Sequence, residues 1–242
     1  MQHNLKKFFL AIIFLPLASC AQWDLNKINK VIKDNTGYTK PLSNQEIVDG
    51  LKEALTIGSQ NSAAAASKTD GYFKHPVIKI PFPPEAKSME EKLRAIGMGK
   101  QVDEFVLTLN RAAEEAGKEA APIFVSAVKQ MTITDGVKIL KGKDDEATQY
   151  LNRTTSSQLH DKFKPVINRA TQKVDVTRYW TPLINAYNKI PFMDKMNPDL
   201  DEYVTQKALS GLFYLVAQEE LKIRKDPVPR VTDLLKRVFG SK

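Results

Sequence analysis

Hydrophobic residues recur at helical spacing along most of the chain, which predicts a largely α-helical protein. Ser43 followed by Glu46 forms a capping-box pattern ahead of an apolar stripe, in a helix expected to run toward Ser67. The cleanest stripe lies within residues 100–116. The expected fold class is all-α, a helical bundle-like single domain. Further helices are predicted over residues 85–96, 122–131, 135–140, 144–162, 166–174, 178–188, 199–225 and 229–239.

Single residues indicate where these helices begin and end. Gly117 is expected at the left-handed position after the 100–116 helix, and Thr134 is expected to cap residues 135–140. Pro165 is expected to interrupt the helix that begins near residue 144. The apolar stripes together predict a core that includes Leu51, Phe105, Leu109, Phe124, Val128, Leu212 and Leu215.

Residues 71–84 break the helical pattern because they contain four prolines. Val77, Ile78 and Ile80 within them predict a short extended apolar segment that packs onto the helices. The fold therefore includes one short extended Pro-rich segment. We find no convincing repeat with a period of 20–50 residues, which excludes a solenoid.

The N-terminus has the architecture of a secretory signal peptide. Lys6 and Lys7 lie in an acid-free start, residues 8–15 are continuously apolar, and small residues precede Cys20. The apolar run is shorter than the roughly 20 residues that a membrane-spanning helix needs. The sequence Leu-Ala-Ser-Cys at 17–20 resembles the bacterial lipobox, in which the cysteine is acylated and becomes the new N-terminus. The alternative is an ordinary signal, or a helical anchor, with an incidental cysteine.

The resulting organisation is a lipoprotein signal peptide over residues 1–19, a lipidated tether over 20–42 and a helical domain over 43–242. Acyl chains on Cys20 would hold the protein stably at a membrane without a spanning helix. Ala21, where an aspartate would signal retention at the inner membrane of enteric bacteria, favours an outer-membrane location facing the periplasm if the source is Gram-negative.

Composition and charge narrow the function classes. The chain is 42% hydrophobic and 26% charged, as globular proteins are. Its single cysteine excludes disulfide frameworks and cysteine-based zinc or iron–sulfur sites. The net charge of +8 falls to +6 without Lys6 and Lys7, and the basic residues form no run with interleaved aromatics. We therefore expect no nucleic acid partner, and weak attraction to anionic lipid headgroups instead.

Signatures of catalysis and cofactor binding are missing from the sequence. It has no G-x-S-x-G elbow, P-loop, H-E-x-x-H pair or complete EF-hand loop. His75 and His160 are isolated and are expected to be surface or capping histidines, because two separate histidines do not make a metal site. We expect no metal and no cofactor.

The most informative polar residue is Glu219. Over residues 199–225 it falls inside the apolar arc of the helix, whereas Glu220 lies at the far edge of that arc. A carboxylate on an apolar face must be paired or neutralised, and Arg111 is a candidate partner. Arg111 lies opposite the main stripe of its own helix, so it would need a second packing surface shared with Asn110 and Glu114. Two interpretations stay open, a structural ion pair and a ligand-binding or catalytic acid.

Several strings of the sequence, taken as a set and in order, resemble a bacterial family known as domain of unknown function 4197. The resemblance implies a helical, often lipid-anchored envelope domain and carries over no active site. The strings are V-I-K-I-P-F-P-P at 77–84, N-R-A-A-E at 110–114, A-P-I-F at 121–124, M-T-I-T-D at 131–135, I-L-K-G at 139–142, A-T-Q-Y at 147–150, Y-V-T at 203–205, G-L-F at 211–213, E-E at 219–220, I-R at 223–224 and 234–240.

These observations favour a lipid-anchored envelope protein that acts as a non-catalytic binding or scaffold module. Its expected contacts are the membrane, through the N-terminal anchor, and an envelope protein or an amphiphilic ligand. The alternatives are an enzyme that uses carboxylates and an arginine in a helical cleft, and a carrier of a lipid or amphiphile.

Overall fold

The structure is a computed structural model that describes residues 43–172, 180, 184, 185, 188, 189, 195–197, 199–225 and 238. The expected signal peptide, tether and lipidation site therefore lie outside the described residues. So do the expected helix over 229–239, apart from residue 238, and most of the helix expected over 178–188.

The described residues form seven α-helices, one short 3₁₀ helix and no strand, which confirms the all-α expectation. The helix α2 begins after Ser43 with the predicted capping box and ends at Ser67. The elements are α2 Asn44–Ser67, η1 Pro84–Ala86, α3 Lys87–Ala95, α4 Gly99–Gly117, α5 Ala120–Gln130, α6 Ile133–Lys141, α7 Glu146–Thr171 and α10 Leu200–Lys225.

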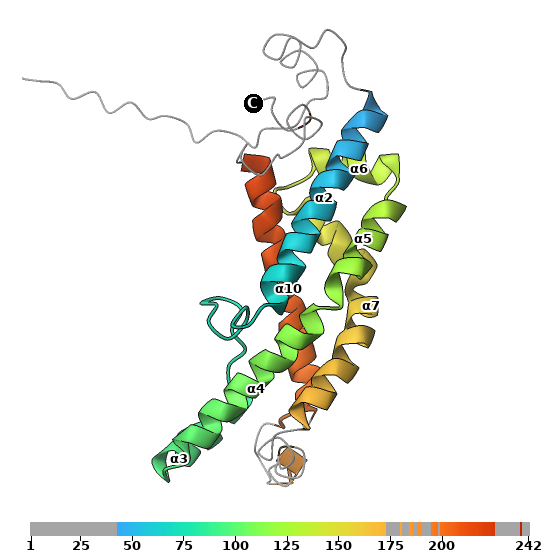
Figure 1. Cartoon of the computed structure of the whole chain (residues 1–242). Helices are drawn as coiled ribbons and strands as arrows, with labels where there is room; N and C mark the ends of the chain where they lie inside the picture. The colour runs from blue at the N-terminus through green and yellow to red at the C-terminus, as the bar shows by residue number, and fades with distance from the viewer. Residues whose placement is uncertain are drawn as a thin grey trace, which may run out of the picture.

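The long helices pack into an elongated bundle (Figure 1). The helix α10 lies against both α7 and α2, α4 packs on α7, and α5 packs on α2. At one end of the bundle α6 lies beside the start of α2, and at the other end the α3–α4 hairpin projects outward (Figure 1). None of the helices in the described part of the chain is long and apolar enough to cross a bilayer.

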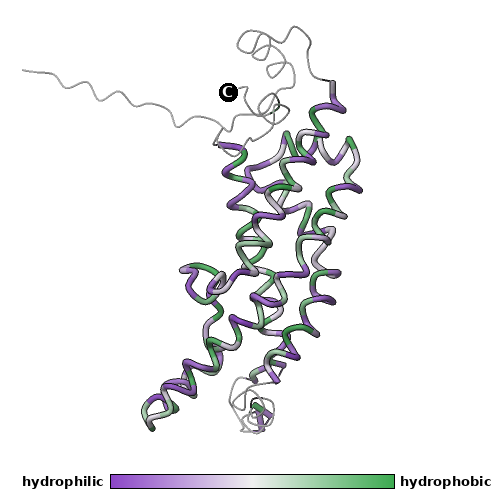
Figure 2. The backbone as a smooth tube through the Cα atoms, viewed as in Figure 1, coloured by the Kyte–Doolittle hydropathy of each residue, from purple (hydrophilic) through white to green (hydrophobic). Residues whose placement is uncertain are grey.

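Hydrophobic and hydrophilic residues alternate along each helix (Figure 2), and the apolar faces meet in one core. Six of the seven predicted core residues are buried, namely Leu51, Phe105, Leu109, Phe124, Val128 and Leu212. Leu215 is only half-buried and packs at the edge of the core.

Three predicted helix boundaries are wrong. Thr132, not Thr134, caps α6, because it forms a capping box with Asp135. Pro165 lies inside α7, which continues without a break to Thr171 and packs against both α4 and α10. Gly117 is the last residue of α4 rather than a left-handed residue beyond it. The Cβ of a larger residue there would lie 3.4 Å from the Ala66 Cβ, an ordinary contact distance.

Residues 68–83 connect α2 to η1 without a helix or a strand, and we call them the arm. The prolines predicted this, but the segment runs through consecutive turns rather than as an extended strand. Ile78 and Ile80 are buried as predicted, whereas Val77 is 60% exposed. The arm projects from the side of the bundle beside α2 and α4 (Figure 1).

Candidate functional site

The predicted polar residues separate into two clusters in the structure. Glu220 forms an ion pair with Arg224 on the same helix, and the two side chains are only 5% and 6% exposed. Asn110, Arg111 and Glu114 lie on α4 and contact the arm. The predicted pair between Arg111 and Glu219 is wrong, because Arg111 is held by Glu114 and Asp70.

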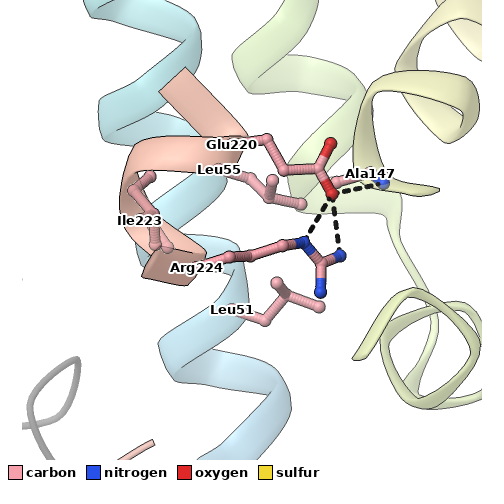
Figure 3. Close-up of a pocket in the computed structure, with 7 residues that line it drawn as sticks. Leu51, Leu55, Ala147, Glu220, Ile223 and Arg224 are labelled. Atoms are coloured by element: carbon pink, nitrogen blue, oxygen red, sulfur yellow. Dashed lines mark hydrogen bonds and ion pairs between the residues drawn. The ribbon is translucent and has the colours of Figure 1, made fainter. Parts of the chain in front are cut away.

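The Glu220 carboxylate binds the N-terminus of α7 (Figure 3). Its Oε1 accepts a hydrogen bond from the backbone N–H of Ala147 at 3.0 Å. Its Oε2 accepts from the backbone N–H and from the hydroxyl of Thr148, both at 2.8 Å. Asp145, at the cap position of α7, makes no side-chain capping bond. Glu220 therefore caps α7 from a distant helix, where a negative charge also suits the helix dipole.

Arg224 extends the same arrangement to the end of α6. Its guanidinium donates to Glu220 Oε1 through Nε at 3.0 Å and through Nη2 at 2.7 Å. Nη2 also donates to the carbonyl of Ile139, in the last turn of α6, at 3.0 Å. The pair thus joins the end of α6 and the start of α7 to α10. The Arg224 cation lies at the C-terminus of α6 and the Glu220 anion at the N-terminus of α7, where the helix dipoles favour these charges.

A small cavity adjoins this ion pair. Its volume is about 10 Å³, which is close to the minimum that one water molecule needs. The lining is mainly apolar (Figure 3) and consists of Leu51, Ala54, Leu55, Ala147, Glu220, Ile223 and Arg224.

Glu219 is less buried than its position in the apolar arc predicted. Its side chain is 17% exposed and forms an ion pair with Lys222 at 2.6 Å. It also accepts a hydrogen bond from Asn61 of α2 at 3.1 Å. The apolar arc that contains Glu219 faces α2, since Gly58 of α2 lies beside Glu219 and Ile223. However, α10 also buries a second face against α7, and Glu220 lies on that face.

Asn110 holds the arm through both atoms of its side-chain amide. The Oδ1 accepts from the N–H of Ile80, and the Nδ2 donates to the carbonyl of the same residue, both at 2.8 Å. The side chain is fully buried, where an unpaired amide would be costly. Asn110 therefore replaces the backbone partner that a neighbouring strand would give Ile80.

Glu114 and Arg111 hold the start of the arm. Glu114, 4% exposed, accepts at Oε1 from the N–H groups of Tyr72 and Phe73, at 3.1 and 3.2 Å. Arg111 donates to Glu114 at 2.6 Å and to Asp70 at 2.7 Å. These bonds raise the pKa of the Arg111 guanidinium. Asp70 has a positive φ of 66°, and its pKa is lowered by Lys74 and Arg111. The face of α4 that carries Arg111 thus packs against the arm.

The arm also contacts α10. The Tyr72 hydroxyl donates to the carbonyl of Ala208 at 2.6 Å, and burial raises the pKa of this phenol. Gly211 of α10 lies so close to Tyr72 and Ile78 that an added Cβ would stand 2.7 Å and 3.0 Å from them. His75 Nδ1 accepts from the N–H groups of Val77 and Ile78, as expected of a capping histidine.

Sequence reasoning missed a third cluster, between the second half of α7 and the start of α10. Lys164 forms ion pairs with Asp199 and Glu202, each at 2.8 Å, and His160 lies 3.0 Å from Glu202. Lys164, the largest contributor, together with His160 and Gln206 lowers the pKa of Glu202 to about 2. The signal in the sequence was the i,i+4 spacing of His160 and Lys164.

An open hollow of about 390 Å³ borders this third cluster. Asn168 and Thr171 both donate to Asp201 beside it, at 2.6 and 2.7 Å. Among the described residues, no group of three or more His, Cys, Asp or Glu is placed to hold a metal ion. The hollow is lined by His160, Asp161, Lys164, Pro165, Asn168 and Asp201.

Comparison with known families identifies the domain. The model of the family described as "Protein of unknown function (DUF4197)" matches residues 41–240, and the chain belongs to this family. The match covers every helix described above. No curated protein and no solved structure matches the chain.

Proposed function

We propose that this member of the DUF4197 family is a lipid-anchored envelope protein whose helical domain is a non-catalytic binding or scaffold module. The proposal combines two parts, an anchor at Cys20 and a rigid domain that follows it. An outer-membrane location facing the periplasm is part of the same proposal and rests on Ala21.

The non-catalytic part of the proposal is supported by one observation: hydrogen bonds within the fold occupy both oxygens of each buried carboxylate. Both oxygens of Glu220 accept hydrogen bonds from α7, and Arg224 covers one of them. Both oxygens of Glu114 are likewise engaged, by two arm amides and by Arg111. A general acid or base needs an oxygen within reach of a substrate. These groups instead join segments of the fold, and the adjoining cavity is about the size of one water molecule.

The anchor is supported by the sequence at the N-terminus. A short apolar segment after two lysines leads directly to Cys20, the only cysteine of the chain. A diacylglycerol and an amide-linked acyl chain would supply more than one hydrophobic anchor, and stable attachment requires at least two such signals.

Replacement of Cys20 tests the proposal. In cells that express the full chain, Cys20→Ser should leave unprocessed precursor and abolish labelling with radioactive palmitate. Ala21→Ser is the matched control, because it changes the adjacent residue and keeps the thiol, and it should be processed and labelled like the wild type. A wild-type chain that is cleaved normally and takes up no label would contradict the anchor.

A further inference from the structure

We propose that the arm around Val77, which we call its tip, and the turn at residues 96–98 between α3 and α4 form one docking surface for an anionic lipid bilayer. The inference deepens the proposed function, on which it rests only for the presence of a membrane beside the domain. It concerns a second contact, made by the folded domain itself rather than by the acyl chains.

Exposed apolar side chains mark these two projections. Only four large hydrophobic residues in the described part of the chain are exposed, and three of them lie here. Val77 on the arm is 60% exposed, and Ile96 and Met98 on the turn are 72% and 36% exposed. The fourth, Ile133, lies at the start of α6 at the other end of the bundle (Figure 1).

The exposed Val77 lies in a segment of the arm that is rich in lysine. Residues 68–81 contain three lysines and one acid, Asp70, whose carboxylate is already held by Lys74 and Arg111. Lys79 lies over the Phe73 ring at 4.6 Å and forms no ion pair with another described residue. Glu114 and Asn110 hold the backbone on both sides of Val77, and His75 Nδ1 accepts from the Val77 N–H itself. A preformed tip loses little conformational freedom when it docks.

The α3–α4 turn has the same character. Residues 92–102 contain three basic residues and no acidic one, and four acidic residues flank them, Glu90 and Glu91 before and Asp103 and Glu104 after. Arg94 pairs with Glu90 and Asp103, whereas Lys92 and Lys100 form no ion pair within the described residues. Gly97, with a φ of 87°, makes the turn, and no atom would lie within 4 Å of an added Cβ. No residue of α3 is fully buried, Met89 and Leu93 pack against the core from one side, and the turn that follows α3 is exposed.

These features suit a lipid surface better than a protein groove. Each projection is a convex point with one or two apolar side chains and nearby lysines. A bilayer interface accepts such side chains at its headgroup boundary, and an anionic leaflet attracts the lysines. Both projections extend from the same side of the bundle in Figure 1, as a contact with one flat surface requires.

The length of the chain before the domain permits this contact. Residues 21–42 separate Cys20 from Ser43, and a segment of that length spans at most about 75 Å. The helix α10, with 26 residues, is about 39 Å long. A domain anchored at Cys20 can therefore lie with this side on the same membrane. The anchor would raise the local concentration, so that a contact that is weak by itself becomes effective.

Vesicle binding by the unacylated chain tests the inference. Residues 20–242 carrying Cys20→Ser would be sedimented with vesicles of phosphatidylcholine alone or mixed with phosphatidylglycerol. We expect binding only to the anionic vesicles and a loss of binding as salt is added. The double variant Val77→Asp with Ile96→Asp should bind these vesicles at least about tenfold more weakly than the parent chain. Ile133→Asp, which changes the one other exposed apolar residue, should bind like the parent chain.

Three outcomes would overturn the inference: no binding of the parent chain to anionic vesicles, undiminished binding of the double variant, or an equal loss in Ile133→Asp. Circular dichroism of each variant verifies that the fold is kept, which is expected because all the changed residues are exposed. The chain in this test carries no acyl group, so its outcome is independent of palmitate labelling at Cys20. Failure of the anchor and failure of the docking surface are therefore distinguishable.

Discussion

Single buried polar side chains act here as backbone partners for distant segments. Glu220 caps α7, Asn110 pairs with Ile80, and Glu114 binds two amides of the arm. An isolated charge or amide in a protein interior is strongly unfavourable, so each such residue is stable only while its partners stay in place. The same residues therefore specify how α10, α4 and the arm are arranged.

Removal of Glu220 should be strongly destabilising. Glu220→Ala removes the carboxylate that pairs with the buried Arg224 guanidinium and that caps the N-terminus of α7. We expect the free energy of unfolding to fall by about 3–5 kcal/mol, measured by urea denaturation followed by circular dichroism. Glu219→Ala is the matched control on the adjacent position. Its ion pair with Lys222 is near the surface, so the loss should stay below about 1 kcal/mol. Equal losses in the two variants would contradict this assignment.

The sequence predicted Glu219, rather than Glu220, as the buried acid because a helical projection counts only one apolar face. The helix α10 packs on α2 and on α7, so its second face is buried as well. The i,i+4 spacing of Glu220 and Arg224 was a readable sign of an ion pair on that face. The α7 amides that complete the site were not predictable, since they come from a helix 72 residues away in the chain.

At the scale of elements, the arm is an irregular segment fixed by its neighbours. Its prolines exclude a helix, and Arg111, which lies opposite the main stripe of α4, needs a second packing surface if it is to be buried. The sequence did not indicate that the arm fills this surface, because the contacts join residues 30 to 42 positions apart. Its exposed tip could not be predicted from Val77 alone, whose residue type favours burial.

The fit between the arm and α10 gives a prediction at Gly211. Gly211→Ala places a methyl group against Tyr72 and the Ile78 Cβ, which should displace the arm and cost about 1–3 kcal/mol of unfolding free energy. Hydrogen exchange of the Tyr72 and Ile80 amides should accelerate in this variant. Gly58→Ala, at the contact of α2 with α10, is the control.

In the control the new methyl group would meet Ile223 and Glu219 at 3.4 and 3.5 Å, an ordinary contact distance. Because alanine also favours the helix, Gly58→Ala should leave stability unchanged or raise it by up to about 1 kcal/mol. An arm that exchanges no faster in Gly211→Ala than in Gly58→Ala would show that the close approach does not hold it.

At the scale of the whole molecule, two polar clusters join the antiparallel helices α7 and α10 near their two ends. Glu220 binds the first turn of α7, while Glu202 and Asp201, in the first turn of α10, bind the second half of α7. Between these clusters α7 buries mainly apolar side chains, with Leu151, Leu159 and Phe163 fully buried, and one polar residue, Thr155. Polar contacts at both ends fix the register of the two helices, which apolar packing alone specifies less strictly.

Unfolding measured at acidic pH should reveal how much the cluster around Glu202 contributes to the stability of the bundle. Folding lowers the pKa of Glu202 from 4.5 to about 2, chiefly through the Lys164 ammonium. A carboxyl group whose pKa is lowered by folding stabilises the native state above its unfolded pKa, and this contribution is lost as the pH falls through the folded pKa. The free energy of unfolding should therefore decrease as the pH falls from about 4.5 to about 2.

Urea midpoints measured across this range should fall less steeply in Glu202→Gln, which has no carboxyl group to titrate and is less stable at pH 7. Glu91→Gln removes an exposed carboxylate of α3 outside the cluster and controls for net charge. If Glu202→Gln and Glu91→Gln lose stability with the same pH dependence as the wild type, the Lys164–Glu202 contact does not stabilise the bundle.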